Sequence, residues 1–472
     1  MKQFLSTIFL LVCASVVLAQ SGRVPAPDAA GGATPVPTKQ MFDEVSRFPA
    51  VKAGEYQAKK IPYNDELAEQ IRKDQRALAA RYAAEAEARK VLTPDDRYFI
   101  GMLHWVALNL DGTIANLKLC YDADGVEPAR AQNARSIAVA ALAQKADLDG
   151  AEKLLADYRA KDPKKNAELA KMEGELTKAY QKAKDPTRML PHALANLAAL
   201  KALMDDPATS QQGRALSYDG EMLLFDAYRG LGQPDMAEAA LDDLKAITVK
   251  AASPAGYYFA IDQKIRYLID TGRKTQAAEL YERTLVAIPT EFADKKKQDE
   301  VIGKLKDHQK AYKLLRGPAP EFMNGDQTWL SGEPRTIASM KGKVVLLDFW
   351  AMWCAPCVAS MPELKEWSED FKADGLEIVG LTRYYGSEYG YPADHAGEIG
   401  VIKSFRDKHK MPYDIVVSDG QAAQLLYGAV LLPTAVLIDR KGVVRYVSTG
   451  TNGTRNAEIR EMIVKLLAEK DQ

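Results

Sequence analysis

The stretch VVLLDFWAMWCAPC, residues 344–357, places two cysteines directly after an apolar run. The run predicts a buried strand, and the segment Ala355–Lys372 that follows predicts a helix. A Cys-x-x-Cys pair at such a junction is what a dithiol redox enzyme needs, because two intervening residues let the sulfurs bridge. The helix N-terminus also favours the thiolate of Cys354. We therefore predict a redox-active pair formed by Cys354 and Cys357.

Zinc sites use the same cysteine spacing and are the alternative for this pair. A structural zinc site normally needs four ligands, and the sequence has no second Cys-x-x-Cys or paired His to complete one. We therefore expect no metal, and no cofactor other than the Cys354–Cys357 disulfide itself.

Length and composition limit the broad class of protein. With 472 residues the chain exceeds what one compact core usually serves, so two or three domains are expected. The hydrophobic content of 47% and the charged content of 27% are typical of globular material. The net charge of −1 gives no indication of nucleic-acid or membrane-surface binding, so no nucleic-acid partner is expected.

Residues 1–19 have the pattern of a secretory signal peptide. Lys2 supplies a positive start, Phe4–Leu18 forms an apolar core, and a cut is expected after Ala19. The apolar run is shorter than the roughly 20 residues of a stable membrane span, and an uncleaved anchor is the alternative. We expect an exported protein, periplasmic or otherwise extracytoplasmic, that is soluble after signal cleavage.

The remaining cysteines are too few for a disulfide-stapled scaffold. Cys13 would leave with the signal, so Cys120 stands alone beside the Cys354–Cys357 pair. Cys120 lies in a helical-looking stretch, where a cysteine usually acts as a small buried apolar residue. A mixed-disulfide or dimer contact is the alternative for Cys120.

Composition divides the rest of the chain. Residues 20–40 are rich in Pro, Ala and Gly and predict a flexible tether. Residues 41–315 are rich in Ala, Leu, Glu and Lys with apolar positions at helical spacing, which predicts an all-helical region. From residue 317 strands and helices alternate, which predicts an α/β layer architecture. The strands are expected at 344–349, 376–382, 413–417, 434–439 and 443–448, and the further helices at 398–409, 421–427 and 454–470.

The helical region contains weak self-similarity. Segments beginning at Asp149, Pro234 and Lys274 resemble the second helices of tetratricopeptide-like hairpins, although their spacing departs from the usual 34-residue repeat. Stacked hairpins of this kind would offer a concave surface to a protein partner, and a non-repetitive bundle is the alternative. The isolated His104, His192 and His308 are predicted to be structural or solvated.

The part from residue 317 to 472 resembles a thioredoxin-fold domain, and within that superfamily the extracytoplasmic thiol-disulfide oxidoreductases related to TlpA and ResA. The motifs that carry the resemblance are PAPEF (318–322), KGKVVLL (341–347), FWAMWCAPC (349–357), MPEL (361–364), LPT (432–434) and IDRKG (438–442). The expected fold class is thus multidomain, with an all-α, tetratricopeptide-like helical-hairpin region followed by an α/β thioredoxin-fold domain.

The thiols and the resemblance together imply a mechanism. Cys354 is expected to be the more exposed, attacking thiolate, and the more buried Cys357 to resolve the mixed disulfide. Pro433 matches the family's cis-proline, and the backbone of Leu432 before it is expected to pair with a substrate strand. Trp353, Ala355 and Pro356 complete the expected substrate-binding set. Because the pair Ala355-Pro356 carries no His or Lys, we expect a reductant-leaning couple.

Two features set this chain apart from the TlpA/ResA pattern. Asp348 stands where that group usually has Asn and thioredoxin has a buried Asp, so it is predicted to take the proton of Cys357. Ser360 stands where the group often has Glu; the alternative for Asp348 is that it only ends the strand. The stretch 384–391 contains four tyrosines, and is interpreted either as an adaptable contact surface or as a crowded loop without a partner.

The sequence therefore predicts an exported protein-disulfide reductase that acts on disulfide-containing client proteins. Because no nicotinamide or flavin motif is visible, a membrane thiol reductase is expected to supply the electrons; cytochrome c biogenesis is one client pathway that the resemblance implies. A peroxiredoxin-type peroxidase is the first alternative, although that chemistry expects Thr where Ala351 stands. The second is a helical adaptor whose thioredoxin-like domain mainly binds partners.

Overall fold

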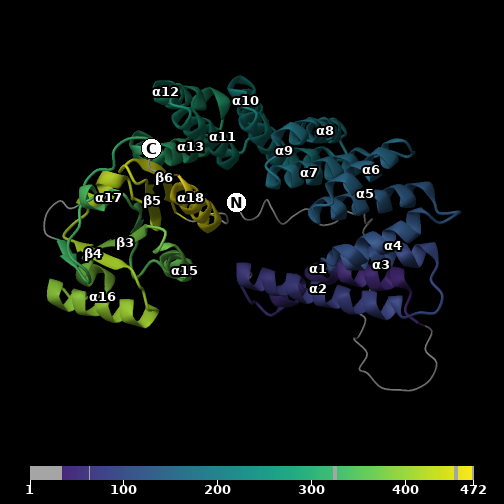
Figure 1. Ribbon diagram of the computed structural model, residues 1–472, viewed down its shortest axis with the longest axis horizontal. Coiled ribbons are helices and arrows are strands. Elements are labelled where there is room, and N and C mark those ends of the chain that lie inside the picture. The colour runs from purple at the N-terminus through teal and green to yellow at the C-terminus, as the bar shows by residue number, and fades with distance from the viewer. Residues whose placement is uncertain (1–34, 63, 323–326, 451–454, 470–472) are drawn as a thin grey trace, which may run out of the picture. The chain divides into compact units, whose positions relative to one another are not determined.

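The computed structural model describes residues 35–62, 64–322, 327–450 and 455–469 (Figure 1). The predicted signal peptide and most of the predicted tether lie outside these residues. The chain divides into two compact units, one ending at Ile247 and one beginning at Thr248. Composition instead places a boundary at 316–317, where the strands begin.

The first unit is all-helical, as predicted. Its elements are α1 (Thr38–Ala58), α2 (Asp65–Glu87), α3 (Pro94–Val106), α4 (Leu110–Tyr121), α5 (Pro128–Gln144), α6 (Leu148–Arg159), α7 (Asn166–Lys182), α8 (Pro186–Asp205), α9 (Ser210–Gly230) and α10 (Pro234–Lys250), the last of which crosses the division. Helix α1 begins at Thr38 rather than at residue 41, because the buried Thr38 hydroxyl donates to Asp96 Oδ1 at 2.8 Å. The last residues of the predicted tether are therefore helical.

Short polar signals start these helices. Thr93 caps α3 in a reciprocal capping box with Asp96, and the Asp147 side chain accepts from the N–H of Gly150 at the start of α6. The self-similar segments fall at the start of α6, of α10 and of α12 (Lys274–Glu291). Whether they make a tetratricopeptide-type repeat stays a prediction.

Two side chains of this unit have the structural character that the sequence suggests. Cys120 is fully buried and unbonded in a core with Ile100 and Leu117, and burial raises the pKa of its thiol to about 11. His192 is buried between two carboxylates, with Nδ1 at 2.7 Å from Glu173 and Nε2 at 2.8 Å from Glu152. Cys120 is therefore a buried apolar residue, and His192 is a packed histidine with ionic partners.

The second unit begins with three helices, which are followed by a six-stranded sheet and the helices that connect its strands. Helices α11 (Pro254–Asp270), α12 and α13 (Lys295–Leu314) come first. The strands are β1 (Gln327–Trp329), β2 (Val344–Phe349), β3 (Leu376–Arg383), β4 (Asp414–Ser418), β5 (Thr434–Ile438) and β6 (Val444–Thr449). The other elements are η1 (Ala338–Met340), α14 (Ala355–Ala359), α15 (Met361–Phe371), η2 (Gly386–Tyr389), α16 (His395–His409), α17 (Ala422–Tyr427) and α18 (Arg455–Ala468).

The sheet has the strand order β1-β4-β3-β2-β5-β6. Strands β2, β3 and β4 are parallel, whereas β1 pairs antiparallel with β4, β5 with β2 and β6 with β5. The predicted strands all form to within two residues, and the short β1 is an addition. The predicted helix Ala355–Lys372 is broken at Ser360, where α14 ends and α15 begins with Pro362 in its first turn.

Each face of this sheet is covered by a different set of helices. Val345, Leu347 and Phe349 share one core with α11, α12, α13 and α17; we call this side the helical face. Val344, Leu346 and Trp350 share the other core with α14, α15, α16 and α18; we call this side the dithiol face, because Cys354 and Cys357 belong to it. The alternation follows from the period of two along β2.

The helices α11 to α13 are fastened to the sheet by hydrogen bonds as well as by the shared core. Arg266 Nη1 donates to Val447 O at 3.2 Å, His308 Nε2 lies 2.6 Å from Thr449 Oγ1, and Arg316 N donates to Val444 O at 2.8 Å. All three bonds reach strand β6. This packing explains why the compact unit begins at Thr248, well before the first strand.

Candidate active site

The two cysteines are joined as a disulfide at the N-terminus of α14. The S–S distance is 2.04 Å, Cys354 is the N-cap residue, and the N–H of Cys357 points at Cys354 Sγ from 3.3 Å. The predicted pairing and its strand-to-helix position are both present. Cys354 is 4% exposed and Cys357 2%, so the expected difference in exposure is small in this oxidised structure.

The predicted substrate-binding residues surround the disulfide. Trp353 is 45% exposed, and Ala355 and Pro356 are also exposed. The Leu432–Pro433 peptide bond is cis, as predicted, and Leu432 packs against the core that contains both cysteines. The cis-proline turn and the Cys-x-x-Cys motif, far apart in the sequence, thus contribute to the same packed region.

Asp348 is buried within β2, on the strand that leads to the dithiol. Its backbone pairs with Gly380 on one side and Ala435 on the other, and β2 continues to Phe349. The strand therefore ends at Phe349, one residue after Asp348, and the role of Asp348 in proton transfer stays a prediction. The side chain is 4% exposed, and Oδ1 has no hydrogen-bond partner among the described residues.

The electrostatics of Asp348 follow from this burial. Loss of water raises the pKa of its carboxyl to about 6, and the positive charge of Arg455 opposes the rise. A carboxyl with this pKa exchanges its proton near neutral pH, which suits it for acid-base work beside a thiol. Arg455 is a residue that the sequence alone did not single out.

The tyrosine-rich stretch lies against Trp353. The Tyr389 ring stacks on the indole of Trp353 with 5.2 Å between centroids, and the Tyr385 ring meets that indole edge-on at 5.4 Å. We call these three residues the aromatic surface; Trp353 and Tyr389 are 45% and 44% exposed. Glu398 holds the stretch in place, because its carboxylate accepts hydrogen bonds from Tyr385 N and Gly386 N at 2.8 and 2.9 Å.

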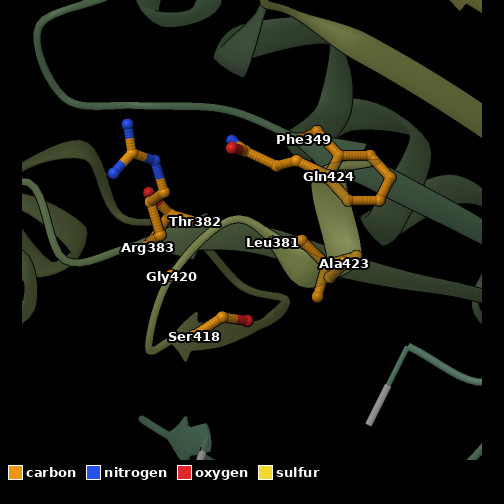
Figure 2. Close-up of a pocket in the computed structure, with 8 residues that line it drawn as sticks. All are labelled: Phe349, Leu381, Thr382, Arg383, Ser418, Gly420, Ala423 and Gln424. Atoms are coloured by element: carbon orange, nitrogen blue, oxygen red, sulfur yellow. The ribbon is translucent and has the colours of Figure 1, made fainter. Parts of the chain in front are cut away.

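A small pocket opens at the carboxyl ends of β2, β3 and β4, and Figure 2 shows the residues that line it. They are Phe349, Leu381, Thr382, Arg383, Ser418, Gly420, Ala423 and Gln424. Neither cysteine and none of the predicted site residues is among them, so the pocket is separate from the dithiol. Within the described part of the chain, no cluster of side chains suited to holding a metal ion is found.

A helix that spans a membrane needs a long, continuous apolar stretch of about 20 residues. Across residues 35–62, 64–322, 327–450 and 455–469, no helix is both long enough and apolar enough to cross a bilayer.

Comparisons with known proteins agree with this geometry. Residues 315–447 match the AhpC/TSA family. The chain is 32% identical over 154 residues to the thiol-disulfide oxidoreductase ResA of Bacillus thuringiensis strain Al Hakam, covering 32% of this chain and 71% of ResA. It is 30% identical over 140 residues to the thioredoxin-like protein YneN of Bacillus subtilis strain 168, covering 30% of this chain and 74% of YneN.

A solved structure of a thiol-disulfide isomerase from Corynebacterium glutamicum is 22% identical, with a TM-score of 0.28, and the match covers 32% of this chain and 98% of that one. The ResA match extends over more than two thirds of the relative, and the Cys354–Cys357 disulfide supplies the chemistry that its name describes. The chain belongs to the ResA family of thiol-disulfide oxidoreductases, and it carries a thioredoxin-like domain behind an extended helical region.

Proposed function

We propose that this oxidoreductase works outside the cytoplasm as a reductant of disulfides in client proteins. The observation that carries the proposal is the Cys354–Cys357 disulfide at the start of α14, with the uncharged Ala355 and Pro356 between the sulfurs. The thiolate of Cys354 then has the helix N-terminus to stabilise it but no cationic side chain between the cysteines, which favours a reducing couple over a strongly oxidising one.

The reaction proceeds in two exchanges. The Cys354 thiolate attacks one sulfur of a client disulfide, forms a mixed disulfide and releases the other client sulfur as a thiolate. Cys357 then loses its proton to Asp348 and attacks Cys354 Sγ. This step closes the Cys354–Cys357 disulfide and releases the second client thiolate. The client gains two electrons and the enzyme is oxidised, so a membrane thiol reductase must return two electrons for each turn.

Client contact is assigned to the exposed residues around the sulfurs. Trp353 and Tyr389 offer ring faces beside Cys354, and the cis turn at Pro433 brings the backbone of Leu432 to the same region. The location rests on the signal-like residues 1–19, and partner recruitment on the helical region. A client that docks on these elements leaves the attacked sulfur close to Cys354.

Trapping tests the proposal directly. Cys357→Ser retains the attacking thiol and cannot resolve the mixed disulfide, so it should accumulate clients bound through Cys354; Cys354→Ser should accumulate none. The redox potential of the wild-type couple should lie near the roughly −270 mV of thioredoxin. A potential near the roughly −120 mV of DsbA would show an oxidant and overturn the assigned direction.

A peroxidase is the second candidate, because the AhpC/TSA family match covers the dithiol. Ala351, which is fully buried, stands three residues before Cys354, where peroxidase chemistry expects Thr. Because alanine has no hydroxyl, this position cannot donate a hydrogen bond to a bound peroxide. We expect the purified protein to turn over hydrogen peroxide no faster than Cys354→Ser does, while it reduces insulin disulfides. Rapid peroxide turnover that depends on Cys354 would favour the peroxidase.

A further inference from the structure

Helix α18 runs back along β2 and brings Arg455 to the dithiol end of the sheet. Arg440 ties their opposite ends together: Nη1 donates to Gly342 O just before β2, and Nη2 to Leu467 O late in α18. From Gly342 the strand advances about 20 Å to Asp348. From Leu467 the helix returns about 18 Å to Arg455, its first residue. Asp348 and Arg455 therefore lie at the same level of the dithiol face, close enough for the charge of Arg455 to act on the carboxyl.

Arg455 is buried where a guanidinium needs a counter-charge. It is 4% exposed, and its Nη1 donates a long hydrogen bond of 3.4 Å to Asn456 Oδ1. Its Nε and Nη2 have no hydrogen-bond partner in the part of the chain that the structure describes. A buried charge left without compensation is strongly destabilising, so the carboxylate of Asp348 on the same face is its natural partner.

Gly380 makes room for the surroundings of this pair. It lies in register with Asp348 across β2 and β3, and a Cβ there would come within 3.0 Å of Trp350 Nε1 and 3.4 Å of Tyr413 Cε2. The indole and the phenol thus close over the glycine, beside Asp348. Asp348 is only 4% exposed, and a dry site strengthens the attraction between Asp348 and Arg455.

The other titratable groups around Asp348 leave Arg455 as its counter-charge. The Tyr413 hydroxyl at the start of β4 is kept neutral, because burial and the nearby Asp348 raise its pKa. Strands β3 and β5 contribute Gly380 and Ala435, which do not titrate. Three further titratable groups on the covering elements, His409, Tyr446 and Glu458, have contacts of their own. On α16 the His409 ring stacks on Phe405, which itself stacks on Trp350. The Tyr446 hydroxyl of β6 donates to Glu458 of α18 at 2.8 Å. Helix α14 contributes Cys354 and Cys357, which are joined as a disulfide here, and α15 contributes Glu363, whose Oε2 is buried without a hydrogen-bond partner among the described residues.

We propose that Arg455 is a positioning residue for the redox reaction, which keeps Asp348 ionised so that it is ready to receive the proton of Cys357. This inference rests on the proposed function, because Asp348 is the proton acceptor there. Burial alone favours the protonated carboxyl, and a protonated carboxyl cannot accept the proton of Cys357. The positive charge of the guanidinium favours the ionised carboxylate, which can accept it. In the resolving step the S–H bond of Cys357 breaks, its proton passes to Asp348, and the sulfur forms the bond to Cys354.

The test removes the charge of Arg455 in the full-length protein. In oxidised Arg455→Met, the titration midpoint of Asp348, followed by carbon-13 NMR of the carboxyl groups and assigned with Asp348→Asn, should rise by at least about 1 pH unit. The pH at which client reduction reaches half its maximal rate should rise with it. Arg455→Lys, which retains a charge, should restore most of both. Arg460→Met on the exposed side of the same helix is the matched control and should change neither.

The outcomes separate this inference from the proposed function. An unchanged Asp348 midpoint in folded Arg455→Met overturns the role of Arg455 while reduction through Cys354 stands. A shifted midpoint with an unchanged rate profile overturns Asp348 as proton acceptor, and the positioning role with it. Arg455→Gln, which loses the charge but keeps hydrogen-bonding groups, repeats the test if Arg455→Met does not fold. In the Asp348→Asn background, Arg455→Met should have no further effect on the rate profile.

Discussion

The helical face and the dithiol face of the same sheet are built on opposite rules. The consecutive residues Leu347, Asp348 and Phe349 alternate between them: Leu347 and Phe349 enter the core shared with α11 to α13, and Asp348 faces the side of the cysteines. A carboxylate buried on the helical side is paired: Asp262 accepts from Arg266 Nε at 2.8 Å and from the Tyr312 hydroxyl at 2.7 Å.

On the dithiol face, buried polar atoms without a hydrogen-bond partner in the described residues gather around the reacting groups. They include Asp348 Oδ1, Trp350 Nε1, the Tyr413 hydroxyl, and Nε and Nη2 of Arg455, and further such atoms are Glu363 Oε2 on α15 and Arg406 Nε on α16. Buried polar groups are normally satisfied because leaving them unpaired costs stability. The comparison teaches that one face of this sheet supplies the stability of the domain, and the other gives up stability for chemistry.

The largest effect on stability is therefore expected on the helical face. Leu347→Ala removes a fully buried side chain and should lower the unfolding free energy of the second unit by about 2–5 kcal/mol. The rate of client reduction per folded molecule should stay close to wild type, because Leu347 points away from the sulfurs. Hydrogen exchange of the β2 and β3 amides measures the unfolding free energy, and an insulin-reduction assay measures the rate of disulfide reduction. A variant with normal stability and lost activity would contradict the division between the faces.

The neighbouring substitution on the dithiol face should have the opposite sign. The pKa of Asp348 is raised by burial to about 6, above its ordinary 3.8, so the folded state holds a proton that the unfolded state loses between these values. Stability consequently falls as pH rises from about 4 to about 6, by up to about 3 kcal/mol, and stays low above that. Asp348→Asn should remove this slope, because the amide does not titrate. The gain should be little at pH 4 and about 1–3 kcal/mol at pH 7, where the loss of the counter-charge of Arg455 offsets part of it.

Activity supplies the second readout of Asp348→Asn. The amide cannot accept the proton of Cys357, so the rate of client reduction should fall and its pH dependence should flatten. Asp439→Asn, a change to a carboxyl outside the dithiol face that is paired with Arg445, is the matched control for loss of one negative charge. A stability profile without a slope between pH 4 and 6 in the wild type would show that Asp348 is not buried as a carboxyl.

The same contrast explains what could be predicted from the sequence. The apolar run of β2 and the Cys-x-x-Cys spacing are local signals, and each leads to the observed structure. The cis bond before Pro433 was predicted from the family resemblance, and it is also present. Arg455 reaches the site because α18 runs along β2 in the folded domain. No local sequence pattern predicts this path of the helix. The residue spacing predicted one helix over 355–372, but the helix breaks at Ser360. Spacing alone did not predict this break, because Pro362 disfavours the interior of one long helix and suits the first turn of a new one.

The start of the second compact unit at Thr248 also could not be predicted from local composition. Composition changes at residue 317, where strands begin, but the apolar faces of α11 to α13 have to be buried somewhere, and the sheet is what covers them. A change of secondary structure therefore marks the end of a helical stretch without marking the end of a core. His308, predicted to be structural or solvated, is, like Arg266, a residue whose contact reaches across this boundary.

A smaller effect is expected at that contact. His308 Nε2 and Thr449 Oγ1 are 2.6 Å apart, and Thr449 pairs with Thr434, the residue after the cis-proline. Removing the bond by Thr449→Val or His308→Ala should lower the unfolding free energy by about 0.5–1.5 kcal/mol. The double variant should cost less than the sum of the two single ones, because they share one interaction. Fully additive losses would show that the bond does not join α13 to β6.

The smallest effect on stability, and a specific one on client capture, is expected at the aromatic surface. Tyr389 is half-exposed and stacked on Trp353, so Tyr389→Ala should leave the unfolding free energy nearly unchanged while removing part of the surface beside Cys354. An aromatic contact of about 1 kcal/mol corresponds to a KM for a protein client that is roughly 3- to 10-fold higher, with kcat unchanged.

A small disulfide such as oxidised glutathione reaches Cys354 without covering the rings, so its kinetics should not change in Tyr389→Ala. Val286→Ala, at an exposed apolar position on α12, is the control for loss of surface apolarity. If protein and small disulfides were affected equally, Tyr389 would act on the sulfurs rather than on clients, and the stretch 384–391 would be a packed loop. The chemistry of the dithiol face would then be confined to its buried groups, with client selection left to the helical region.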